Sequence, residues 1–254
     1  MWDYCKFYSD PKYLGGQGSS IGIGSCYGYY PPSHTDYRAL VINVKKTELD
    51  FSELHERMQW YVDGKSIPFV ATAVLQGDEV VDLHYCGQQD IEGGKPLSET
   101  SIFRMHSSTK IACSIAAMML YEENKFSLDD PIDAYIPAFR NMRVLKSSAT
   151  SIDDTEPTHS PILIRHILSH TAGLSYGFIE PDSIINQAYN KRSINPMAPG
   201  SDMSLESMCD QLGDLPLAYQ PGTSWRYSFA TDVTARLIEV LSGKRFDEFL
   251  KERI

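Results

Sequence analysis

The chain has 254 residues, of which 42% are hydrophobic and 11% aromatic, a composition typical of a globular protein with one large domain or two small ones. Its 33 acidic and 23 basic residues give a net charge of −10, and no basic block stands out, so nucleic acid and anionic membrane surfaces are poor candidate partners. The five cysteines are odd in number and contain no CxxC pair, which indicates reduced thiols and argues against a disulfide framework or a zinc site.

The sequence has no apolar run of the roughly 18 residues that a membrane-spanning helix needs, and it does not begin with a basic segment followed by an apolar one. As written, the chain is therefore expected to be cytoplasmic. Residues 1–45 are rich in glycine and tyrosine and show neither a helical nor a strand period. They predict a poorly ordered extension, followed by a folded domain over residues 46–254.

The first regular elements are expected shortly after this extension. Asp50 can cap a helix over "DFSELHERMQWYVDG", with Glu53 three residues further on as in a capping box. The stretch "IPFVATAVLQGDEVVDLHYCG" then places two β-branched runs on either side of Gly77 and Asp78, a pair typical of a tight turn. This pattern predicts a β-hairpin.

Three amphipathic helices are predicted further along the chain. They cover about residues 110–124, the stretch "PILIRHILSH", and the stretch "ATDVTARLIEVLSG", which ends at Gly243. Residues 140–160 and 175–222 are rich in Ser, Asp, Pro and Asn and predict long loops with short helices.

The stretch "FRMHSSTKIACSIAAMMLYEENK" contains the pattern S-x-x-K at Ser107 and Lys110. Residues three apart lie on the same face of a helix, so the hydroxyl and the amine can meet there. A serine becomes a nucleophile when a neighbouring base takes its proton, and a lysine can act as that base if burial lowers its pKa. Four residues are expected to form the apolar wall that buries it: Ile111, Ala112, Ile115 and Ala116.

By itself the S-x-x-K spacing has little specificity. It occurs again from Ser9 to Lys12, in the predicted extension. On spacing alone, a serine that caps the helix beside a solvated lysine is the better explanation of Ser107 and Lys110.

Three segments together resemble the serine beta-lactamase-like hydrolases, closest to the class C beta-lactamase and family VIII esterase branch that includes D-alanyl-D-alanine carboxypeptidases. They are "FRMHSSTKIACSIAAMMLYEENKFSLDDPIDAYIPAF", "ILIRHILSHTAGL" and "PGTSWRYSFATDVTARLIEVLSGKRFDEFLKERI". The resemblance implies an α/β (α+β) fold with an antiparallel sheet flanked by helices plus a helical region. It also implies that Ser107 is acylated, with Lys110 and Tyr227 as its catalytic partners and either one, or both, as the base.

The resemblance further implies a substrate class. The family's asparagine two residues after the tyrosine, which contacts an amide of the substrate, is replaced by Phe229. Carboxylic esters are therefore expected as substrates before beta-lactams or D-amino-acid peptides, and no metal or organic cofactor is implied. The alternative is an inactive fragment or a ligand-binding remnant of the family. The expected partner is a small-molecule ester or amide, neither nucleic acid nor a membrane span is expected, and the oligomeric state stays open.

Two other motifs point to different chemistry. "GLSYG" matches the nucleophile elbow G-x-S-x-G at Ser175, but it lacks a preceding strand and a later histidine. His166 and His170 have the i, i+4 spacing of zinc ligands without a recognisable third ligand, which favours structural roles. His106, next to the candidate nucleophile, is expected to be a packing residue.

The resemblance also predicts a third motif, K-T-G, H-x-G or W-x-G, on a strand that lines the pocket after Tyr227. The last 27 residues contain no such strand and read as one helix and the start of another. The sequence is therefore expected to be the N-terminal portion of the family's domain.

Overall fold

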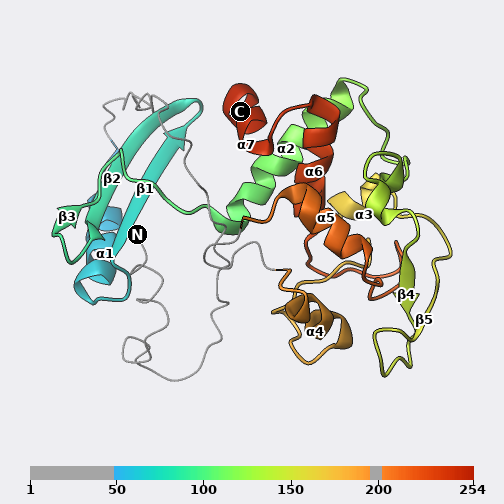
Figure 1. Ribbon diagram of the computed structural model, residues 1–254. Helices are drawn as coiled ribbons and strands as arrows, with labels where there is room; N and C mark the ends of the chain where they lie inside the picture. The colour runs from blue at the N-terminus through green and yellow to red at the C-terminus, as the bar shows by residue number, and fades with distance from the viewer. Residues whose placement is uncertain (1–48, 195–201) are drawn as a thin grey trace. The chain divides into compact units, whose positions relative to one another are not determined.

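The computed structural model describes residues 49–194 and 202–254, which belong to two compact units divided near residue 105 (Figure 1). The predicted extension over residues 1–45 lies outside the described residues. None of the helices in the described ranges has both the length and the apolar character needed to cross a membrane.

The first unit contains one helix and a three-stranded antiparallel sheet. Its elements are α1 (Ser52–Asp63), β1 (Phe69–Gln76), β2 (Glu79–Asp90) and β3 (Lys95–Pro96). The predicted hairpin is confirmed, with the register running from Phe69 opposite Gly87 to Gln76 opposite Glu79. Gly77 makes the turn with a φ of 63°, a left-handed conformation that glycine adopts without steric cost. The strand order is β1-β2-β3, so the hairpin has a third, short partner that the sequence did not predict.

Helix α1 begins at Ser52, one residue later than a cap at Asp50 implies, and packs against the hairpin. The carboxylate of Asp50 accepts a hydrogen bond of 2.9 Å from the backbone N–H of Ser52 in the first turn. Met58 is buried, and the hydroxyl of Thr72 on β1 donates to its sulfur over 3.1 Å. Leu54, another apolar residue of α1, is 36% exposed.

The second unit is mainly helical. Its elements are the 3-10 turns η3 (His106–Ser108), η4 (Ile132–Ala134) and η5 (Pro137–Phe139), the strands β4 (Arg143–Leu145) and β5 (Thr155–Pro157), and the helices α2 (Thr109–Glu122), α3 (Ile164–Leu168), α4 (Ile184–Lys191), α5 (Leu205–Gly213), α6 (Ala230–Ser242) and α7 (Phe246–Arg253). The three predicted amphipathic helices are confirmed as α2, α3 and α6, and Gly243 ends α6 in the left-handed conformation.

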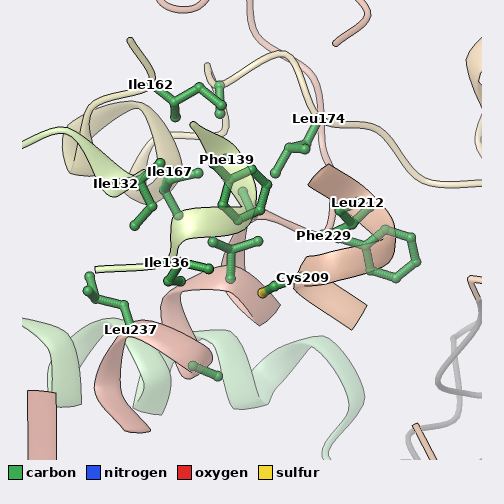
Figure 2. Packing of buried hydrophobic residues seen from close by; sticks show 14 of the residues in the cluster. Ile132, Ile136, Phe139, Ile162, Ile167, Leu174, Cys209, Leu212, Phe229 and Leu237 are labelled. Carbon is green, nitrogen blue, oxygen red and sulfur yellow. The ribbon is translucent and has the colours of Figure 1, made fainter. Parts of the chain in front are cut away.

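Helices α2 and α6 lie side by side in this unit (Figure 1). Their contact includes small buried side chains of α2, Cys113, Ala116 and Ala117, which are at most 2% exposed. Around them a single cluster of buried apolar residues joins the helices, the 3-10 turns and β4; Figure 2 shows part of it. In place of the long loop predicted over residues 140–160, β4 and β5 form a short antiparallel ribbon, and Leu145 extends it by donating to the carbonyl of Leu217 over 2.9 Å.

Candidate active site

The structure places Ser107 and Lys110 at the start of α2. Ser107 lies in η3 and is exposed, whereas Lys110 lies in the first turn of α2 and is half-buried. The residue before the serine, His106, has a φ of 45°, which is unusual for any residue other than glycine. Strained backbone of this kind is concentrated at functional sites, where the surrounding structure holds it in place.

Tyr227 meets Ser107 although 120 positions separate them in the sequence. Their hydroxyl oxygens are 2.8 Å apart, within hydrogen-bond distance. Tyr227 precedes α6 by three residues and Ser107 precedes α2 by two, so the packing of α6 on α2 brings the two side chains together. The structure thus groups the serine and the tyrosine that the sequence singled out.

Aromatic rings, and not the predicted aliphatic wall, surround the ammonium of Lys110. Its Nζ donates to the hydroxyl of Tyr176 over 3.3 Å and lies 5.1 Å from the ring centroid of Tyr227 and 5.7 Å from that of Tyr176. The expected wall is wrong for two of its members, because Ile111 is 68% exposed and Ile115 is 50% exposed. Helical spacing places these two on another face of α2.

Two buried residues that sequence reasoning missed extend this group. Tyr176, which is 1% exposed, donates from its hydroxyl to the Oδ2 atom of Asp232 over 3.4 Å, and Asp232 is itself only 7% exposed. An ordered series therefore runs from the ammonium of Lys110 through the phenol to a buried carboxylate. The sequence offered one signal for it: Asp232 lies in the apolar stretch that begins α6, where a buried carboxylate needs a partner.

His170 supports the tyrosine from the other side. Its ring centroid is 5.0 Å from that of Tyr227, its Nδ1 atom is 3.1 Å from the hydroxyl of Ser228, and its Nε2 atom is 3.4 Å from the hydroxyl of Thr231. Burial, with a smaller contribution from the charge of Lys110, lowers the pKa of His170 to about 4. The imidazole is therefore neutral at physiological pH and anchors the segment that carries Tyr227.

The other two motifs receive structural roles. Ser175 is completely buried, and its hydroxyl accepts a hydrogen bond of 3.4 Å from Arg226, so it is not placed as the exposed nucleophile of an elbow. The Nδ1 atom of His166 accepts the backbone N–H of Leu163 over 3.2 Å at the start of α3, while His170 contacts Tyr227. The two histidines thus stabilise different parts of the unit.

Phe229, the residue at the family's asparagine position, belongs to the core. It is 2% exposed and lies among the buried apolar side chains (Figure 2). Its ring centroid is 4.2 Å from that of Tyr176. A buried apolar ring offers no hydrogen bond to a substrate amide. The ring of Phe229 instead packs against the ring of Tyr176.

Comparison with known proteins places these residues in a family. A family model described as Beta-lactamase matches residues 54–254. Protein Rv1367c of Mycobacterium tuberculosis (strain ATCC 25618 / H37Rv) is 34% identical over 183 residues, which are 72% of this chain and 44% of that protein. Esterase EstB of Burkholderia gladioli is 30% identical over 171 residues, which are 67% of this chain and 40% of that protein.

A comparison with solved structures identifies the fold. EstCE1, described as a hydrolase with promiscuous acyltransferase activity, matches with a TM-score of 0.68 at 27% identity, over 80% of this chain and 50% of that one. The chain spans half or less of the length of these three relatives. With its helices, its antiparallel sheets and the family model that covers most of its length, the chain belongs to the Beta-lactamase family and has the α/β fold of beta-lactamases and transpeptidases.

Proposed function

We propose that this chain provides the nucleophile and the proton-transfer group of a serine hydrolase that cleaves carboxylic esters through an acyl-enzyme. The observation that carries the proposal is the 2.8 Å contact between the hydroxyl oxygens of Ser107 and Tyr227 beside the ammonium of Lys110. Nucleophilic catalysis requires an exposed serine hydroxyl in hydrogen-bond contact with an ionisable group, and here that group is the phenol of Tyr227 beside the amine of Lys110.

The reaction follows from this geometry in two stages. Ser107 Oγ forms a bond to the ester carbonyl carbon as the C=O π bond opens to an oxyanion, and its proton passes to the base of the site, which is either the phenolate oxygen of Tyr227 or the neutral amine of Lys110. The same group returns the proton to the leaving alcohol as the C–O bond breaks. Water then attacks the acyl-serine, gives its proton to the same pair, and releases the acid while Ser107 recovers its hydrogen.

The charge that develops on the carbonyl oxygen needs donors aimed at it. The backbone N–H of Ser107 is one candidate, because it lies at the start of a helical segment, where N–H groups have no intrahelical acceptor. The positive end of α2 adds to this effect. Both features favour acyl transfer over reactions that develop positive charge.

Ester substrates fit the site better than amides do. One relative is the esterase EstB, and EstCE1, whose fold this chain shares, is described as a hydrolase with promiscuous acyltransferase activity; both descriptions favour ester chemistry. The buried position of Phe229 supports the same choice, because no amide-recognising side chain stands there. We therefore infer small-molecule esters as the substrate class.

A fluorophosphonate probe tests the proposal, since it phosphonylates an activated serine. Covalent labelling of the chain is expected, and it should disappear in Ser107→Ala. The matched control is Ser175→Ala, which removes the serine of the elbow-like motif and should keep the label. Labelling that persists in Ser107→Ala, or no labelling of the folded chain at all, would refute the proposed nucleophile.

A further inference from the structure

Five rings follow one another across the candidate site, and we name them the aromatic row. Neighbouring ring centroids are 4.9 Å apart between Phe178 and Tyr176, 5.4 Å between Tyr176 and Tyr227, 5.0 Å between Tyr227 and His170, and 6.2 Å between His170 and Trp225. Such spacings are those of aromatic side chains in direct contact. Tyr227, whose hydroxyl meets Ser107, stands at the middle of the row.

Exposure changes sharply along the aromatic row. Tyr176 is 1% exposed and packs in the core, whereas the two end rings, Phe178 and Trp225, are 48% and 64% exposed. Two large apolar rings are thus left open to solvent at the two ends of a series of ring contacts with Tyr227 at its middle, and exposed rings of this kind are suited to contact an apolar ligand. Scattered exposed aromatics are common, but these two are joined to the candidate nucleophile through an unbroken series of ring contacts.

The segments that carry the two end rings are tied together. Arg226, adjacent to Trp225, forms an ion pair of 2.9 Å with Glu180, two residues after Phe178. The backbone N–H of Arg226 also donates to the carbonyl of His170 over 3.0 Å. These contacts hold the end rings in place before a ligand arrives, which reduces the entropy lost on binding.

We propose that Trp225 and Phe178 form two apolar subsites that hold the acyl group and the alcohol group of the ester on opposite sides of the bond that is cleaved. This inference rests on the proposed function, because an ester carries two substituents on opposite sides of its carbonyl carbon. The carbonyl lies at Ser107 and Tyr227, in the middle of the aromatic row. The substrate class is thus narrowed to uncharged esters that are apolar or aromatic on both sides.

Binding measurements without turnover separate this inference from the chemistry. In a Ser107→Ala background, the affinities for p-nitrophenyl acetate, p-nitrophenyl hexanoate and 1-naphthyl acetate are measured by calorimetry. The hexanoate reports the acyl side, and the naphthyl ester reports the alcohol side. Trp225→Ala and Phe178→Ala are compared with Trp60→Ala, whose indole is 59% exposed in the hairpin unit.

One end-ring variant is expected to bind the hexanoate about tenfold more weakly and the other to bind 1-naphthyl acetate about tenfold more weakly, as loss of one apolar contact surface implies. Trp60→Ala should bind all three esters as the parent does. Trp225→Phe should recover most of the loss caused by Trp225→Ala, since it restores an aromatic face. Circular dichroism checks that every variant keeps its fold.

The two proposals fail in different ways. If neither end-ring variant binds more weakly than Trp60→Ala, or if both affect the same ester only, the inference is overturned even when Ser107-dependent labelling is intact. If the end rings control binding but the fluorophosphonate probe does not label Ser107, the binding sites stand and the proposed hydrolysis is refuted.

Discussion

Replacement of Tyr176 by phenylalanine should slow acylation while leaving the core packing in place. The variant keeps the ring that packs against Tyr227 and Phe229, with centroid distances of 5.4 and 4.2 Å. It removes only the hydroxyl that accepts from Lys110 over 3.3 Å and donates to Asp232 over 3.4 Å. The ammonium then loses a fixed acceptor and gains freedom to move away from Ser107.

The size of the effect follows from the hydrogen bonds lost. A hydrogen bond that involves a charged group contributes about 1.5–3 kcal/mol. If that positioning is needed in the transition state, the acylation rate of the variant should fall about 10-fold to 150-fold. The free energy of unfolding should fall by about 1–3 kcal/mol, because the buried carboxylate of Asp232 loses a donor.

Pre-steady-state release of p-nitrophenol from p-nitrophenyl acetate measures acylation directly, and urea denaturation measures stability. Tyr189→Phe is the matched control: Tyr189 is fully buried, and its hydroxyl accepts the backbone N–H of Ser175 over 3.4 Å, away from the ammonium. It should lose comparable stability but keep its acylation rate. An acylation rate within twofold of the parent in Tyr176→Phe, or an equal loss in both variants, would refute positioning through Tyr176.

Three further outcomes follow from the same contacts. Lys110→Ala should reduce the acylation burst at least about a hundredfold with the fold intact, and a retained burst would exclude Lys110 from proton transfer. Phe229→Ala should lower the free energy of unfolding by about 3–5 kcal/mol in urea denaturation, because the ring is fully buried, and a loss below about 1 kcal/mol would contradict that packing. His170 should make the free energy of unfolding depend on pH. Its pKa is about 6.5 in the unfolded chain and is lowered to about 4 in the folded chain. Between these two pH values the unfolded chain binds a proton at His170 and the folded chain does not, so stability falls as the pH falls. By pH 4 the free energy of unfolding should have fallen by about 2 kcal/mol, less than for a fully buried ring because solvent reaches part of the imidazole. Urea denaturation of His170→Asn should not show this fall.

The parts of the fold that could be predicted are those with local patterns. The hairpin around Gly77 combines β-branched runs with a turn pair, and α6 combines an apolar period with Gly243 at its end. The strands β3, β4 and β5 have only two or three residues each, too few to produce an alternating pattern. Their pairing depends on contacts that are distant in sequence, such as that of Leu145 with Leu217.

The residues of the candidate site also differ in whether the sequence alone could predict them. Spacing places Ser107 and Lys110 near each other, and the resemblance adds Tyr227 on the basis of a motif. No local pattern connects Tyr176 to Asp232, since 56 positions separate them. The surroundings of the lysine were also mispredicted, because helical spacing does not tell which face of α2 contacts the rest of the unit.

The packing of α2 on α6 explains why a serine and a tyrosine so far apart in the sequence meet in one place. Both helices begin within three residues of the Ser107–Tyr227 contact, so both positive helix ends lie near it and favour negative charge on a reacting oxygen. Small side chains let the two helices approach closely, and the thiol of Cys113 on α2 reaches the carbonyl of Thr231 on α6 over 3.5 Å. Protein interiors are closely packed and hardly compressible. The distance between the two hydroxyls is therefore set by the buried contact between α2 and α6. The buried helix contact therefore positions the two hydroxyls, and such positioning favours a reaction in which a proton moves over a single hydrogen bond.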